Sequence, residues 1–343
     1  MVLVPALSAA VSAWVLYAGA RSINRRLLVA VFGSLVVLSN ALAAVAPDFA
    51  VLIVARVFLG MAIGGFWSVV PPIGPRLVGP GLGAKATTFI VSGVSIGTVV
   101  GLPAGQFLAS EVGWRWTFGI ASLVSIVAIA TEVVLLPSVK AVSRNRVRQL
   151  VEVLKLPLTR AGLIVTLIVF VGQFTASTYI TPFLLDRDAS TPEPSRSCWS
   201  ATAQRASSAP SSAGFSSPAI VTWVTAALGT GAALIGLAIL GQEHLALGAM
   251  LVVWGLIWGA VPLSSQVWFL SSAGEHQEPA SSVGVTTMQI AIAGGAALGG
   301  LLVDTAGLTT VFAVAGSLAV AAALLAMAIG RDRASGGEAA GRF

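Results

Sequence analysis

Long apolar stretches alternate with short polar connectors along almost the whole chain. About 20 apolar residues in a helix are enough to cross the hydrocarbon core of a bilayer. Ten stretches approach or exceed this length, and they cover residues 2–20, 27–46, 50–74, 86–110, 115–137, 161–185, 219–240, 245–270, 282–303 and 307–330. Backbone groups in lipid must be paired within their own segment, so the pattern predicts a helix for each stretch.

The charges between these stretches predict how the chain crosses the membrane. Basic residues gather in the connectors after the first, third, fifth and last stretches, and such connectors stay on the cytoplasmic side. They are Arg21, Arg25, Arg26, Arg76, Lys85, Lys140, Arg144, Arg146, Arg148, Lys155, Arg160, Arg331 and Arg333. We therefore predict a multi-pass protein of the inner or plasma membrane, with its N-terminus outside and its C-terminus in the cytoplasm.

A chain that begins outside and ends in the cytoplasm must cross the membrane an odd number of times. The apolar stretches number ten, which is even. The segment after the sixth stretch ought to cross, yet residues 189–217 are rich in serine and proline and contain Glu193, Arg196 and Arg205. Each Arg at mid-membrane costs roughly 2.5–3.5 kcal/mol. One hypothesis is that unrelated sequence replaces a helix here, for example after a frameshift. The alternative is a long polar external loop, after which the second half of the chain is inverted.

Composition agrees with a lipid environment and excludes several functions. Of the 343 residues, 56% are hydrophobic and 9% charged, against roughly a quarter charged in soluble domains. The net charge of +6 comes from the connectors, so it does not indicate nucleic-acid binding. Cys198 is the single cysteine, His244 and His276 lie in different connectors, and no phosphate-binding loop occurs. We expect no metal, no cofactor and no enzyme activity.

One local pattern occurs twice along the chain. Residues 101–113 read GLPAGQFLASEVG, and residues 295–307, which lie 194 positions later, read GAALGGLLVDTAG. Each copy predicts a glycine-spaced helix, a tight turn at the last glycine and a second helix, because glycines four apart let helices approach closely. Duplicated halves are an architecture of secondary transporters, with the substrate site between them near mid-membrane.

Four regions resemble the major facilitator superfamily, most of all its drug:proton antiporter branch with sugar-efflux and purine-ribonucleoside-efflux proteins. The resemblance runs from about Leu7 to Gly330, apart from residues 189–217. The connector with Arg25 and Arg26 is similar to the signature loop between helices two and three of that family. Residues 56–67 are similar to the Arg motif of helix four, residues 93–105 to the antiporter motif of helix five, and residues 172–182 to helix seven.

The resemblance implies an all-α membrane fold of two helix bundles. Family members have twelve helices, so it also implies that the first is lacking and that the eighth has been replaced. We expect an N-terminal bundle over residues 1–137 that holds family helices two to six, and a cytoplasmic linker over 138–160. A C-terminal bundle over 161–330, with the irregular segment 189–217, and a cytoplasmic tail over 331–343 would follow. Arg21 and Tyr17 stand where the family's signature loop has Asp and Gly.

Two ionisable residues inside predicted spans are candidates for proton coupling. Charge in lipid is costly, so such groups usually face a cavity or a partner. The resemblance implies proton coupling for Arg56, whose alternative is an interfacial position. Glu132 could load a proton on one side and release it on the other, or could simply extend to the inner interface. The resemblance adds Arg25 and Arg26 as gating residues.

The remaining candidates are helix contacts and substrate contacts. The expected helix-packing positions are Gly60, Gly64, Gly65, Gly97, Gly101, Pro103 and Gly105. The expected cavity residues are polar or aromatic, namely Trp67, Gln173, Thr178, Tyr179, Trp254, Trp258, Gln266 and Gln289. Aromatic planes and amides suit a flat, polar, neutral ligand such as a nucleoside. The alternatives are interhelical hydrogen bonds for the amides and core filling for the tryptophans.

Together these patterns predict a secondary active transporter that exports a nucleoside, sugar or drug-like molecule in exchange for protons. Its partners would be the small-molecule substrate, protons and the lipid bilayer, with no nucleic acid, and we expect a monomer. The alternative is a truncated or frameshifted remnant that does not transport, or a membrane scaffold, because loss of a helix would remove one wall of the cavity.

Overall fold

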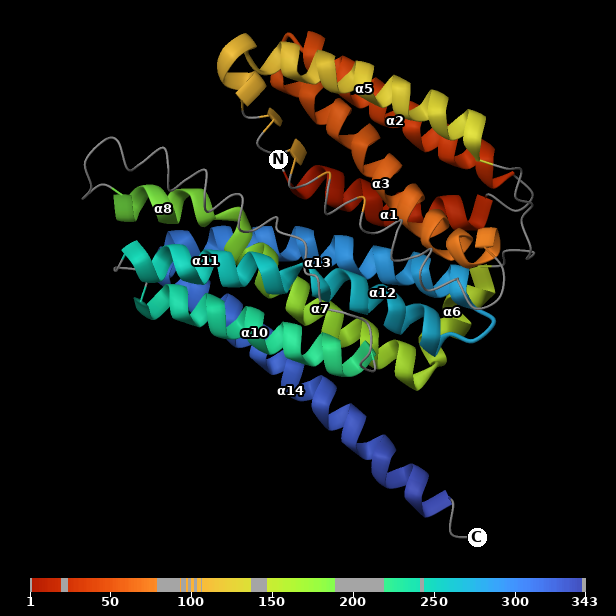
Figure 1. Ribbon diagram of the computed structural model, residues 1–343, viewed down its shortest axis with the longest axis vertical. Coiled ribbons are helices and arrows are strands. Elements are labelled where there is room, and N and C mark those ends of the chain that lie inside the picture. The colour runs from red at the N-terminus through yellow and green to blue at the C-terminus, as the bar shows by residue number, and fades with distance from the viewer. Residues whose placement is uncertain are drawn as a thin grey trace. The chain divides into compact units, whose positions relative to one another are not determined.

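The protein is all-α throughout the part of the chain that its computed structural model describes. That part comprises residues 2–19, 24–78, 107–136, 147–188, 219–240 and 244–340, with single positions between residues 93 and 105. The chain divides into two compact units (Figure 1). Unit 1 contains Met1–Leu156 and Ala273–Ala293, and unit 2 contains Pro157–Ser272 and Gly294–Phe343.

Unit 1 is built from long apolar helices that pack side by side. They are α1 (Leu3–Gly19), α2 (Arg25–Val45), α3 (Phe49–Val78) and α5 (Trp114–Leu135), followed by the short α6 (Val147–Lys155). α3 packs on α1 and on α2, and α2 also packs on α5. Polar residues begin two of these helices: the Asn24 side chain accepts a hydrogen bond from the backbone N–H of Arg26, and that of Asp48 accepts one from Val51.

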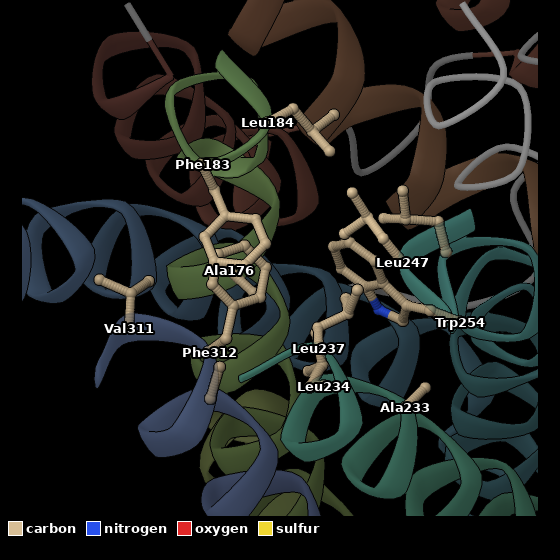
Figure 2. Close-up of a cluster of buried hydrophobic side chains, with 12 residues drawn as sticks. Ala176, Phe183, Leu184, Ala233, Leu234, Leu237, Leu247, Trp254, Val311 and Phe312 are labelled. Carbon is tan, nitrogen blue, oxygen red and sulfur yellow. The ribbon is translucent and has the colours of Figure 1, made fainter. Parts of the chain in front are cut away.

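Unit 2 is arranged around α14 and α10. Its helices are α7 (Pro157–Thr178), α8 (Ile180–Asp188), α10 (Ala219–Leu240), α11 (His244–Trp258), α12 (Ala260–Ser272) and α14 (Leu308–Ala340). α14 packs against α7 and α10, and α10 packs against α11 and α12. Aromatic and aliphatic side chains from these helices form a buried cluster, in which the rings of Phe183 and Phe312 lie 4.2 Å apart (Figure 2).

α13 (Gln277–Ala306) is continuous and belongs to unit 1 up to Ala293 and to unit 2 from Gly294. In its first half the hydroxyl group of Ser282 donates to the carbonyl of Ala13 at 2.8 Å, and that of Ser281 to the carbonyl of Trp67 at 3.2 Å. In its second half the carbonyl of Gly295 accepts a hydrogen bond from the hydroxyl group of Thr175 on α7 at 3.1 Å. The boundaries predicted for the two bundles stay a prediction.

The tight turns predicted for the two copies of the repeat are confirmed. Gly113 precedes α5 with a φ of 82°, and Gly307 separates α13 from α14 with a φ of 81°. Both values lie in the left-handed region, which residues with a Cβ adopt at a cost. The matching glycines of the two copies therefore have the same structural task, namely to reverse the chain between consecutive helices.

Within the described residues, eight helices are long and apolar enough to cross a membrane. Most of the predicted spans match them. α1 holds a shorter apolar stretch, Leu3–Ala13, and the predicted span 86–110 lies mostly outside the described residues, as does segment 189–217.

Two predicted spans contain a helix break that the sequence pattern did not indicate, although Ala246–Ser272 still forms one candidate span across its break. The span 161–185 breaks at Tyr179, between α7 and α8, and the span 245–270 breaks at Gly259, between α11 and α12. A proline follows each break by three residues, Pro182 and Pro262. Proline has no N–H for the carbonyl four residues earlier and crowds it, so both helices are interrupted at this point.

Candidate functional site

A cavity of about 280 Å³ lies within unit 1, between α2, α3 and α5. Its lining is largely apolar and aromatic, and it includes Phe32, Phe66, Trp67 and Ile129. The rings of Phe66 and Trp67 meet edge to face, with their centroids 6.0 Å apart. Cavities that bind small molecules combine such walls with a few polar groups.

Glu132 is the single ionisable residue among the described residues that line this cavity. The carboxylate has neither a hydrogen bond nor an ion pair with any residue that the structure describes. α5 is a candidate membrane span, and an unpaired charge inside a membrane is unfavourable. The geometry therefore gives Glu132 a cavity in which a proton or a ligand can reach it.

Arg56 lies on α3, away from this cavity. Its guanidinium group is 5.1 Å from the centre of the Phe118 ring on α5, which is a cation–π contact. Phe118 precedes Glu132 by 14 residues on the same helix, or about 21 Å at 1.5 Å per residue. The structure therefore does not bring the two candidate coupling residues together.

Three of the predicted packing glycines in unit 1 lie so close to a neighbouring helix that a side chain would not fit there. The Cβ of a side chain at Gly60 would meet the carbonyl of Pro5, one at Gly64 the carbonyl of Ala9, and one at Gly65 the ring of Phe32. The contacts of Gly60 and Gly64 are with backbone atoms of α1 and with the hydroxyl groups of Ser8 and Ser12 on the same helix. Glycine at these two positions therefore lets α3 approach α1 closely.

The glycines of the predicted helix-five motif show no such contacts. Gly97, Gly101 and Gly105 are helical, and a Cβ at any of them would have no described atom within 4 Å. Pro103 lies outside the described residues. Arg25 and Arg26, which the sequence places in the connector before this span, form the first turn of α2.

In unit 2, a ladder of buried hydrogen bonds joins α7 to α11 and α12. Thr159 and Ser272 are joined through their hydroxyl oxygens at 2.9 Å, Thr166 donates to Ser265 at 3.3 Å, and the indole N–H of Trp254 donates to the Gln173 side chain at 2.7 Å. The α7 members are seven residues apart, so they lie along one side of the helix.

This ladder gives Gln173 and Trp254 a packing role. Gln173 is 4% and Trp254 0% exposed, and each is the other's hydrogen-bond partner. Interhelical hydrogen bonds and core filling, the alternatives to substrate contact, therefore account for both side chains as they stand.

We predict a measurable coupling between Gln173 and Trp254. In a double-mutant cycle with Gln173→Leu and Trp254→Phe, the interaction energy should be about 0.6–1.7 kcal/mol, the range for hydrogen bonds between membrane helices. Thermal unfolding in detergent would measure it. Gln289→Leu is the control, because Gln289 is only partly buried and has no described partner. An interaction energy of zero would contradict the packing role.

Other predicted cavity residues lie at the two helix breaks. Tyr179 is at the first break and donates its hydroxyl hydrogen to the carbonyl of Ala296 on α13 at 3.2 Å. Thr178 and Trp258 are the last residues of α7 and α11, and their carbonyls are the two that Pro182 and Pro262 leave without the usual helical donor. Interrupted helices with free carbonyls form binding sites in many transporters.

Gln266 is a further buried polar group in unit 2. It is 3% exposed, and its side-chain oxygen has no hydrogen-bond partner among the described residues. An unpaired buried acceptor is costly, roughly 1–3 kcal/mol, so the position is available to a water molecule or a polar ligand.

Sequence patterns missed two features of these sites. One is the pairing of Ser265, a polar residue that the sequence grouped with Trp254 and Gln266: its hydroxyl group accepts hydrogen bonds from Thr166 and, at 2.8 Å, from the indole of Trp223. The seven-residue spacing of polar residues in α7 could have revealed its partner. The other is the aromatic pair Phe32 and Phe66 at the cavity, which no sequence signal separates from ordinary core residues.

Comparison with known proteins agrees with this architecture. The family model described as Major Facilitator Superfamily matches residues 1–293. The chain is 29% identical over 332 residues to the purine ribonucleoside efflux pump NepI of Escherichia coli K12, covering 89% of this chain and 78% of the pump. Identity to the pump of the same name from Salmonella paratyphi A is 31% over 310 residues, with 89% and 77% covered.

Solved structures share the fold at low sequence identity. The human organic anion transporter MFSD10 has a TM-score of 0.68 at 18% identity, covering 95% of this chain and 81% of that one. The fucose:proton symporter FucP of Escherichia coli has a TM-score of 0.69 at 12% identity, covering 95% and 88%. The helices, the duplicated turns and the match over most of the chain lead to one conclusion: this protein is a membrane transporter that belongs to the Major Facilitator Superfamily.

Proposed function

We propose that the protein is a proton-coupled exporter and that Glu132 is its proton-carrying group. The observation that supports this most is a carboxylate without a partner among the described residues, in an apolar, aromatic cavity beside a candidate span. A neutral, protonated carboxyl group suits such a cavity, and an ionised one suits it only when water or a cation enters.

Antiport follows if proton and substrate cannot occupy the cavity together. In the proposed cycle, substrate enters from the cytoplasm and Glu132 releases its proton to that side. The carboxyl group regains a proton once the site has opened outward and the substrate has left. Most of the cavity's lining residues lie in the half of their helix that the charge pattern assigns to the cytoplasmic side, where substrate for export would be collected.

We further propose a purine ribonucleoside as the substrate. Two relatives of this chain bear that substrate in their names. Flat bases pack well on aromatic rings, and Phe32, Phe66 and Trp67 supply such rings at the cavity. Arg56, Arg25 and Arg26 stay proposed as coupling and gating residues, and a monomer in the inner membrane with two bundles over residues 1–137 and 161–330 is the proposed setting.

A transport assay with everted membrane vesicles tests this function. Labelled inosine, a labelled sugar and a fluorescent dye would be offered with and without an imposed pH gradient. We expect gradient-dependent accumulation of inosine that an uncoupler abolishes. Inosine accumulation that is the same with and without the pH gradient would contradict proton coupling. No accumulation of any compound would favour the non-transporting scaffold.

We also predict the orientation of the connectors. In a Cys198→Ser background, a cysteine at Glu111, next to the turn at Gly113, should react with an impermeant maleimide on intact cells. A cysteine at Arg148 should react only in everted vesicles, because basic connectors stay in the cytoplasm. Both positions are exposed, so accessibility within the fold is matched. The reverse labelling pattern would contradict the proposed topology.

A further inference from the structure

The short helix α6 has an apolar side that the protein covers only in part. Leu150 and Val153 are wholly buried, whereas Val151 is 46% and Leu154 37% exposed. At about 100° per residue, these four side chains form one continuous sector of the helix. Half of this sector is therefore left uncovered by the described protein.

Positive charge borders the uncovered half. Around the circumference of α6, Lys155 and Arg148 follow directly after Val151, on the side away from Leu154. Both are exposed. Arg148 has a salt bridge of 2.8 Å to Glu152, its nearest acidic neighbour. Six basic residues stand in the segment 140–160 against that one glutamate. An apolar strip beside a cationic edge is the pattern of helices that lie flat on a membrane.

The chain places α6 at the membrane surface. A single residue separates it from α7, a candidate span that begins at Pro157. α7 has 22 residues, which at about 1.5 Å each only just exceeds the apolar thickness of a bilayer. A helix that ends one residue before this span must therefore lie close to the boundary between lipid and water.

The size of the uncovered strip favours lipid over a protein partner. The two exposed apolar side chains that the structure describes here are far fewer than the roughly 20–30 residues a side of a specific protein interface. We propose that α6 is an interfacial helix, with Val151 and Leu154 among the upper acyl chains and with Arg148 and Lys155 on the headgroups of anionic lipids. This surface would hold the connector between α5 and α7 on the membrane, independently of the transported substrate.

Quenching by lipids tests this placement. A bimane label would be attached at Leu154→Cys or, as the control on the other side of α6, at Glu152→Cys, both with Cys198→Ser in the full chain. The protein would be placed in phosphatidylcholine vesicles with brominated acyl chains, with or without phosphatidylglycerol. We expect quenching at position 154 on the order of twice that at 152. Equal quenching at the two positions, or none at 154 because protein covers it, would overturn the proposal.

Charge variants test the anionic headgroups separately. Quenching at position 154 should rise when phosphatidylglycerol is present and fall again in high salt. Arg148→Gln with Lys155→Gln should remove this dependence. Glu152→Gln should strengthen it, because Arg148 then loses its competing partner. Dependence on phosphatidylglycerol that is the same in all variants would show that α6 does not contact anionic lipid through these residues.

Discussion

Replacing Glu132 with glutamine should abolish pH-gradient-driven export and bring it down to the level of vesicles without the protein. Glutamine keeps the shape of the side chain but carries no exchangeable charge, so the cavity can no longer load and release a proton. Exchange of labelled for unlabelled substrate should persist, because exchange needs the binding site but no net proton movement. Vesicle transport in both modes would measure the two effects.

Glu111→Gln is the matched control for this variant. Glu111 is exposed beside the turn at Gly113 and lies outside the cavity lining, so its replacement should leave both modes of transport unchanged. If Glu132→Gln still accumulates substrate against a gradient, the proton is carried elsewhere. If it loses exchange as well, Glu132 is needed for binding or for the fold.

Gly64→Leu should destabilise unit 1 by about 3 kcal/mol, the upper end for over-packing a close contact. A Cβ at this position would meet the carbonyl of Ala9, a backbone atom that cannot move without shifting α1. Gly64→Ala should have a smaller effect of the same sign. Thermal unfolding in detergent, followed by circular dichroism, would measure both.

The control for this variant is Gly119→Leu on α5. A Cβ at Gly119 has no described atom within 4 Å, so the added side chain has room. Glycine is also a poor helix former, which makes a neutral or slightly stabilising effect the expected result. Equal losses of stability at positions 64 and 119 would show that the contact between α3 and α1 is not the cause.

The sequence was a reliable guide to the helices, because hydrophobic length and proline are local signals. The positive φ at Gly113 and Gly307 follows from the repeat, since matching glycines occupy the same turn. The interruptions before Pro182 and Pro262 could have been predicted from proline chemistry. They were missed because a hydropathy pattern does not distinguish a broken helix from a straight one.

The candidate sites were harder to predict, because they depend on which helix sides meet. Gln173 and Trp254 look like ligand contacts in sequence, yet they hydrogen-bond to each other in a buried position. Conversely, sequence alone could not decide whether Glu132, near the end of α5, extends to the interface or faces a cavity, whereas the structure places it in the lining of a cavity with Phe66 and Trp67. Burial and pairing are properties of the assembled helices, and a single span does not reveal them.

Proton movement during transport is the most direct measure of the central claim. Purified protein would be placed in liposomes with a pH-sensitive dye inside, and an inosine gradient would be imposed without any initial pH difference. Exchange of substrate for protons predicts that inosine flowing out drives protons in and acidifies the interior, and that Glu132→Gln removes this signal. Inosine that crosses the membrane while the internal pH stays constant would contradict proton coupling.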